Sequence, residues 1–167
     1  RDPHLRPRRQ RQMCIRDSAH LVPTLVTYEA DAKYGPSFGW NEENSSKNAE
    51  VLSAGLTSLE NALSNNVNVG YGTDLCWSPK SYQGDGLLIH EKVCGAAEAL
   101  RHCTLNNARI VRMEGKIGEI TAGAHADLVV LDTNPLKSMN CFSQKSNSIV
   151  AVLQGGIPVR DDKLLFD

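Results

Sequence analysis

The most suggestive group in the sequence is an aspartate at the end of a predicted strand, in Gly72-Thr73-Asp74. Open α/β sheets and (β/α)8 barrels place their functional side chains at the carboxyl ends of strands. A carboxylate in such a place can ligate a divalent cation and accept a proton from a bound water. The same aspartate can instead cap a helix or fix a turn, and three residues alone favour that interpretation.

Other residues near this motif are weaker candidates for chemistry. Thr73, Tyr82 and Asp85 lie on or just after the predicted strand and could touch a substrate, although ordinary surface roles are commoner for loop residues. Cys76 has no histidine base nearby in the sequence, which favours a small buried hydrophobic side chain over a nucleophile. Trp77 is as well suited to packing as to lining a pocket.

The histidines are scattered along the chain, and we interpret them as structural or solvated side chains. His20 precedes a predicted strand and is expected to be partly exposed. His90 and His102 fall within predicted helices, and His125 lies in a predicted turn. The remaining histidine, His4, belongs to the N-terminal stretch.

The cysteines do not indicate a disulfide framework or a zinc knuckle. Their number is odd, their spacing is wide, and no C-x-x-C pair occurs. We therefore expect reduced, mostly buried thiols, which favours a cytoplasmic location. The five residues are Cys14, Cys76, Cys94, Cys103 and Cys141.

Charge is distributed unevenly along the chain. Residues 1–18 contain six arginines and two aspartates, whereas the remaining 12 basic and 17 acidic residues give a net charge of −5. A mildly acidic body with 5% aromatic residues argues against nucleic acid as a partner. No apolar run approaches the roughly 20 residues that a membrane span needs, so we expect no membrane association.

The first eighteen residues form a basic stretch that allows three interpretations. It is a targeting or nucleic-acid-binding tail, a plain solvated tail, or a non-native leader. We favour the last, because Met13–Ser18 resembles a spurious leader found in translations of assembled sequence reads. In each case we expect residues 1–18 to be disordered.

The elements before Asp74 form a predicted β-α-β unit. A run rich in β-branched residues, Leu21–Tyr28, predicts a buried strand, and residues 31–48 predict a long polar loop. A helix is expected from Asn48 to Asn65, followed by a short strand over Asn66–Gly72. A helix between two strands implies a parallel pair in an α/β fold. The apolar face of the helix carries Leu52, Leu56, Leu59 and Leu63.

After Asp74 the pattern changes from helical to all-β. A loop over Cys76–Gly86 precedes helices expected over Leu87–Val93 and Gly95–Val111. The remaining segments predict three strands, with Gly155-Gly156 as a hairpin turn. These strands are expected over Ala126–Asp132, Ile149–Gln154 and Ile157–Val159. The change near Arg112 divides the chain into residues 19–111 and residues 112–167.

The tail carries a resemblance to a known family. Ala108–Asp132 closely resembles the G-x-I/L-x-x-G-x-x-A-D-L-V-V-x-D signature of the amidohydrolase superfamily, where the chain leaves the barrel for a small β-sandwich. Val150–Val159 is similar to the hairpin of that sandwich. The segment VPTLVTYEA further resembles the strand-7 region of the subgroup related to imidazolonepropionase and Xaa-Pro dipeptidase-like hydrolases.

The resemblance implies a fold and a role for Asp74. It implies the C-terminal part of a (β/α)8 TIM barrel, strands 7 and 8, followed by part of a small β-sandwich domain. Asp74 lies where the strand-8 aspartate of the family lies, which implies a metal ligand that also acts as general base and then general acid. The cofactor implied is one or two divalent metal ions, usually zinc.

The resemblance also implies that most of the site is missing. Family members use an H-x-H pattern on strand 1 and further ligands on strands 4, 5 and 6, and Asp74 is the one position here onto which a ligand role can be carried. We therefore expect an inactive, unstable fragment of a hydrolase that acts on carbon–nitrogen bonds of small non-peptide or dipeptide-like amides. A catalytically silent barrel relative that binds or assembles is the alternative. A homo-oligomer is compatible with either.

Overall fold

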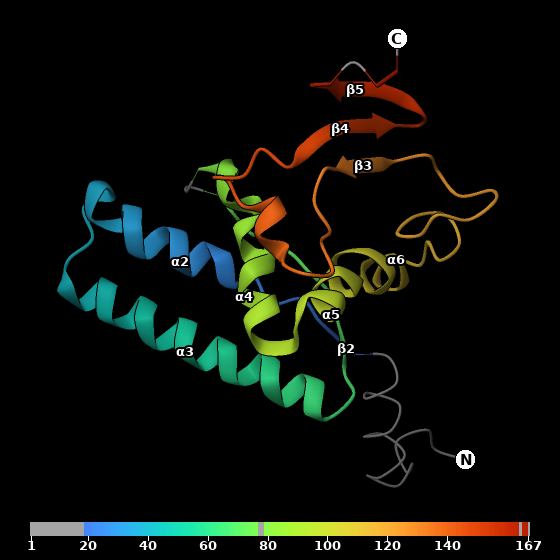
Figure 1. Cartoon of the computed structure of the whole chain (residues 1–167). Coiled ribbons are helices and arrows are strands. Elements are labelled where there is room, and N and C mark those ends of the chain that lie inside the picture. The colour runs from blue at the N-terminus through green and yellow to red at the C-terminus, as the bar shows by residue number, and fades with distance from the viewer. Residues whose placement is uncertain (1–18, 77–78, 164, 167) are drawn as a thin grey trace, which may run out of the picture.

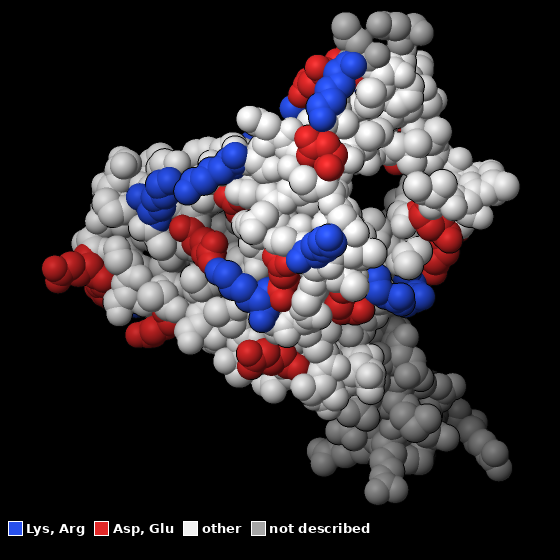
Figure 2. Space-filling model, in the orientation of Figure 1, with Lys and Arg blue, Asp and Glu red and all other residues white. Residues whose placement is uncertain are grey.

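The structure is a computed structural model that describes residues 19–76, 79–163 and 165–166. Figure 1 shows the helices grouped together, with a separate antiparallel sheet towards the C-terminal end. Figure 2 shows basic and acidic side chains interleaved over one face of the molecule, without a large patch of one sign. In the described part of the chain no helix is both long enough and apolar enough to span a membrane.

The strands on either side of the first helical region pair in parallel. They are β1 (His20–Leu21) and β2 (Asn68–Val69). The predicted parallel pair is therefore confirmed, although both strands are shorter than expected. Leu21 lies opposite Val69, which is buried in the core.

A helix replaces most of the first predicted strand. Residues Leu25–Tyr34 form α2, so the prediction of a strand over Leu21–Tyr28 is wrong beyond Leu21. Val26 and Ala30, four residues apart, are both buried in the core, which places them on one helical face. Burial of that face outweighs the β-propensity of Val26 and its β-branched neighbours, because propensity is a weak preference that packing overrides.

The predicted polar loop over residues 31–48 is largely helical. A 3-10 turn, η2 (Gly35–Phe38), ends at Gly39 in a left-handed conformation with φ of 85°, and α3 (Glu42–Ser64) follows. Asn41 caps α3, because its side chain accepts a hydrogen bond from the backbone N–H of Asn44 at 2.9 Å. The acidic and amide residues that predicted a loop therefore begin a helix.

The predicted apolar face of α3 is confirmed. Leu59 is fully buried, and three further leucines of α3 pack against the same core. The buried side-chain amide of Asn48 donates to the Tyr28 carbonyl at 2.8 Å and so ties α3 to α2, which run side by side in Figure 1. The three further leucines are Leu52, Leu56 and Leu63.

Of the two helices predicted after Asp74, the first is longer than expected and the second is divided into shorter pieces. A 3-10 turn, η3 (Lys80–Gln83), leads into α4 (Asp85–Cys94), so the expected loop ends earlier. The predicted helix over Gly95–Val111 is confirmed, but it is divided into α5 (Ala96–Arg101), a π-helical turn η4 (His102–Asn106) and α6 (Asn107–Ile110). Single π-helical turns change the direction in which later side chains point.

The three strands predicted in the C-terminal tail are confirmed, and they pair as one antiparallel sheet. Its strands are β3 (Leu128–Leu131), β4 (Ile149–Gln154) and β5 (Ile157–Asp161), in the order β3-β4-β5. A 3-10 turn, η5 (Met139–Phe142), precedes β4. The hairpin turn at Gly155-Gly156 has φ values of 57° and 84°, which match the two-residue turn that two glycines predict.

Candidate active-site region around Asp74

The segment that carries Asp74 is held close to its neighbours by two glycines. A side chain at Gly70 would overlap the side-chain oxygen of Asn107, and one at Gly72 would come within 2.8 Å of Val22. Since neither glycine has a Cβ, the backbone after β2 can lie directly against these neighbours. The two glycines therefore let the strand end pack tightly against these neighbours.

Two asparagines from the π-helical region hold the backbone of the same segment. Asn106 donates to the Val69 carbonyl at 2.8 Å, and the Asn107 side chain both accepts from the Tyr71 N–H and donates to the Tyr71 carbonyl, each at 2.9 Å. These amides satisfy backbone groups that a neighbouring strand would otherwise satisfy. The sequence pattern carried no signal for this role, because it depends on the π-turn.

Asp74 adopts a backbone conformation that is uncommon for a residue with a side chain. Its φ is 50°, in the left-handed region, which costs about 1–2 kcal/mol for residues other than glycine. Its carbonyl oxygen accepts two hydrogen bonds, from the hydroxyl of Thr27 at 3.1 Å and from the N–H of Cys76 at 3.0 Å. These bonds offset part of the cost. The Asp74 side chain is exposed.

Cys76 contacts the Asp74 carboxylate directly. Its thiol donates to Oδ1 of Asp74, with sulfur and oxygen 3.4 Å apart. This hydrogen bond, together with the negative charges of Asp74 and Asp31, raises the pKa of the Cys76 thiol. The prediction of a buried Cys76 is wrong, because the residue is exposed. A raised pKa keeps the thiol protonated, which agrees with the expectation that it is not a nucleophile.

The described part of the chain does not supply a complete metal site. A catalytic zinc needs about three protein ligands, and residues 19–76, 79–163 and 165–166 contain no group of three or more histidine, cysteine or acidic side chains able to hold a metal. His20 lies on β1, where its Nδ1 faces the Asn68 amide at 3.0 Å. Asp74 is thus a single carboxylate, and the residues present do not fit a metal ion by themselves.

Two histidines form a buried pair where α4 meets η4. His90 of α4 and His102 of η4 are 1% and 0% exposed, and their Nδ1 atoms lie 2.8 Å apart. Burial first, and the neighbouring ring of His102 second, lower the pKa of His90 to about 4, against a smaller opposing effect of the Pro23 carbonyl. Burial also lowers the pKa of His102, against the opposing charge of Glu98. Both rings are therefore neutral, structural side chains at pH 7.

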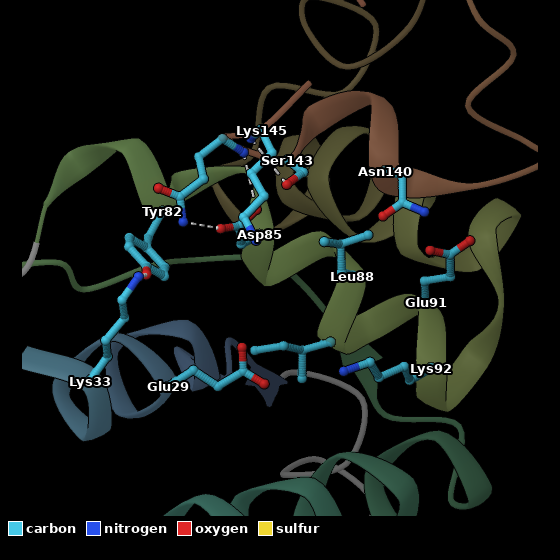
Figure 3. Close-up of a pocket in the computed structure, with 12 residues that line it drawn as sticks. Glu29, Lys33, Tyr82, Asp85, Leu88, Glu91, Lys92, Asn140, Ser143 and Lys145 are labelled. Atoms are coloured by element: carbon cyan, nitrogen blue, oxygen red, sulfur yellow. Dashed lines mark hydrogen bonds between the residues drawn. The ribbon is translucent and has the colours of Figure 1, made fainter. Parts of the chain in front are cut away.

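The weaker candidates Tyr82 and Asp85 line a cavity of about 520 Å³, whose lining does not include Thr73 or Asp74. Figure 3 shows this cavity between α2, α4 and the segment that follows η5. Trp77, another weak candidate, lies outside the described residues.

Both candidate residues of the cavity, Tyr82 and Asp85, accept hydrogen bonds from neighbouring side chains. Tyr82 accepts a hydrogen bond from Lys33 at 2.8 Å, which lowers the pKa of the phenol and raises the pKa of the lysine. Asp85 accepts from the backbone N–H of Gln144 at 3.1 Å and from its side-chain amide at 2.8 Å. Tyr82 and Asp85 therefore both have hydrogen-bond partners within the chain.

Comparison with known proteins adds independent information on ancestry. Residues 8–159 match the model of the Amidohydrolase family, and the match begins within the N-terminal stretch that lies outside the described residues. The chain is 28% identical over 133 residues to a 5-methylthioadenosine/S-adenosylhomocysteine deaminase of Acetivibrio thermocellus. That alignment covers 68% of this chain and 31% of the deaminase, so the chain spans about a third of its curated relative.

Solved structures give a nearer relative. A prolidase solved in complex with N-methylphosphonate-L-proline is 40% identical, with a TM-score of 0.79 over 89% of this chain and 36% of the prolidase. A Xaa-Pro dipeptidase solved with bound methionine shares the fold, with a TM-score of 0.74 at 21% identity, over 95% of this chain and 38% of the dipeptidase. These neighbours confirm the expected similarity to Xaa-Pro dipeptidase-like hydrolases. The chain belongs to the amidohydrolase family, and its α/β arrangement with a small antiparallel sheet is part of a TIM-barrel-type fold.

Proposed function

We propose that the protein containing this chain hydrolyses a carbon–nitrogen bond in a small amide, and that its substrates are dipeptides with a C-terminal proline. The choice of substrate is supported by the 40% identity to a prolidase, which exceeds the 28% identity to a deaminase. The observation that carries the choice of residue is the place of Asp74, just beyond the carboxyl end of β2 in a parallel pair.

In this proposal β1 and β2 correspond to strands 7 and 8 of the barrel, and Asp74 is the catalytic aspartate and a metal ligand. The carboxylate takes a proton from the attacking water and passes it to the leaving nitrogen. The whole protein uses a divalent metal, zinc by expectation, which would activate that water. Its remaining ligands would come from strands beyond the described residues.

Several further features belong to the same proposal. The barrel portion covers residues 19–111 and the β-sandwich portion residues 112–167. The partner is a small-molecule substrate, with neither nucleic acid nor membrane involved, and a homo-oligomer is compatible with it. The four cysteines of the described residues are free thiols, which supports a cytoplasmic location.

The direct test replaces the carboxylate in the complete protein. We expect Asp74→Asn to lower kcat/KM for Xaa-Pro dipeptides by about a thousandfold or more, because the amide cannot take up a proton. Asp162→Asn is the matched control, since Asp162 is exposed and pairs with Arg160 in the tail. Activity of Asp74→Asn within tenfold of the unaltered enzyme would contradict the proposal.

Two alternatives are decided by the choice of substrates in the same assay. The curated relatives are deaminases, so 5-methylthioadenosine is tested beside the dipeptides. Turnover of the nucleoside alone would replace dipeptide hydrolysis with deamination. No turnover of any substrate by the metal-loaded complete protein would favour a silent barrel that binds or assembles.

A further inference from the structure

A hydroxyl from a different element holds the turn that presents Asp74. Thr27 is the third residue of α2, 47 positions earlier in the chain, and its Oγ1 donates to the Asp74 carbonyl oxygen at 3.1 Å. The Cys76 N–H donates to the same oxygen at 3.0 Å. The carbonyl oxygen of Asp74 is thus held from two sides, once by its own turn and once by the first turn of α2.

The position of Thr27 is itself determined by packing. Its neighbours Leu25 and Val26 are buried in the core, at 4% and 1% exposure, and Ala30 one turn later is fully buried. These contacts fix the first turns of α2, while Thr27 is half-buried and directs its hydroxyl at the Asp74 turn. Because the backbone of Thr27 is already fixed by this packing, the hydrogen bond to Asp74 costs little further conformational entropy.

The hydrogen bond from Thr27 affects the direction of the Asp74 carboxylate through the geometry of the backbone. The direction of a Cα–Cβ bond follows from the two peptide planes that flank it. Before Asp74, the Asn107 side chain holds the backbone of Tyr71. After Asp74, Thr27 holds the carbonyl. Without the Thr27 hydroxyl, the peptide between Asp74 and Leu75 would be free to rotate, and Asp74 would leave its left-handed conformation. The direction of the Asp74 carboxylate would change with it.

We propose that Thr27 is a positioning residue that holds the Asp74 turn in its left-handed conformation and so aims the Asp74 carboxylate. The inference rests on the proposed role of Asp74 for its effect on catalysis. Its structural part, the clamp on the turn, stands on the Thr27–Asp74 and Cys76–Asp74 hydrogen bonds alone.

The test compares variants of the complete protein that differ in one hydroxyl. Thr27→Ala removes the hydroxyl and Thr27→Ser keeps it, and both residues are tolerated in a helix. We expect Thr27→Ala to lower kcat about tenfold, which corresponds to about 1.4 kcal/mol, with KM within twofold. Thr27→Ser should restore kcat to within threefold. Thr57→Ala is the matched control, because the exposed Thr57 hydroxyl donates to the Ser53 carbonyl one turn earlier in α3, at 3.2 Å.

A second measurement reports on the turn without reference to activity. Amide hydrogen exchange at Cys76, whose N–H donates to the Asp74 carbonyl, should quicken about tenfold in Thr27→Ala and stay unchanged in Thr27→Ser and Thr57→Ala. The midpoint of thermal unfolding shows whether the whole fold is affected. If Thr27 only stabilised the fold, Thr27→Ala would lower the midpoint of thermal unfolding. Exchange at the Cys76 amide would then quicken no more than exchange at the neighbouring amides.

The outcomes separate this inference from the proposed function. If Asp74→Asn is inactive while Thr27→Ala matches the unaltered enzyme in kcat and in exchange at Cys76, positioning by Thr27 is overturned and the role of Asp74 stands. Failure of Thr27→Ser to restore kcat would also overturn it. If Asp74→Asn stays active, the proposed function falls, and exchange at Cys76 alone then decides whether Thr27 clamps the turn.

Discussion

At the scale of single residues, the two buried histidines give the molecule a polar contact within an apolar core. His90 and His102 face each other through their Nδ1 atoms, and the rings of Tyr71 and His90 form a T-shaped pair with centroids 5.4 Å apart. The His102 Nε2 lies 3.6 Å from Glu98, whose side chain is 41% exposed. One neutral ring donates and the other accepts, an arrangement that two protonated rings cannot keep.

This pair predicts a loss of stability in mild acid. The pKa of His90 is lowered from 6.5 in an unfolded chain to about 4 in the folded protein. Its contribution is therefore fully present above pH 6.5 and is lost as the pH falls towards 4. We expect a decrease of about 3 kcal/mol in the free energy of unfolding over that range.

Urea unfolding of the complete protein at a series of pH values measures this effect. His90→Asn, which cannot titrate, should flatten the pH dependence even though it lowers stability at pH 7. His125→Asn is the control, because His125 is exposed. An equal slope in the unaltered protein and in His90→Asn would show that the pair does not govern acid stability.

At the scale of elements, the tail turn η5 packs directly onto the backbone that begins α4. A side chain at Gly84 would overlap the carbonyl oxygen of Phe142, the last residue of η5. Gln144 reinforces this contact through its hydrogen bonds to Asp85. The helical part and the tail therefore meet at a backbone contact that leaves no room for a methyl group.

Two glycine substitutions test this contact. Gly84→Ala should lower the free energy of unfolding by about 2–3 kcal/mol, because the atom it meets is backbone and cannot move aside. Gly55→Ala is the matched control, since its Cβ would meet only the end of the Leu25 side chain, at 2.5 Å. A gain of up to about 1 kcal/mol in helix propensity offsets that contact. Equal effects of the two substitutions in thermal unfolding would contradict this account.

At the scale of the whole molecule, the chain spans about a third of the length of the relatives it matches. It covers 31% of a curated deaminase and 36% of a solved prolidase. In the described residues β1 and β2 pair only with each other, so each has an open edge that a closed barrel would pair.

This arrangement predicts that the isolated 167-residue chain has no activity. Added zinc should produce no turnover of Xaa-Pro dipeptides, because the described residues contain no group of three side chains able to hold the ion. The measurement compares the chain with the complete protein at equal concentration, with and without zinc. Zinc-dependent turnover by the chain that Asp74→Asn abolishes would overturn the expectation.

Features that depend on local pattern could be predicted from the sequence. The leucine face of α3, the glycine hairpin and the strands of the tail follow from apolar spacing and turn residues, which a short segment carries within itself. The family resemblance likewise rests on short motifs, and the match over residues 8–159 confirms it. The sequence by itself thus determined the family and the candidate residue Asp74.

Features that depend on contacts between distant segments were decided only by the tertiary structure. Burial of Val26 and Ala30 turned a predicted strand into α2, and the π-turn brought Asn107 to the backbone of Tyr71. Asp74 has a left-handed backbone conformation, and its carbonyl accepts a hydrogen bond from Thr27, 47 positions earlier in the chain. No local pattern encodes such pairings, because the energy that selects them comes from packing and hydrogen bonds between segments that meet only in the folded chain.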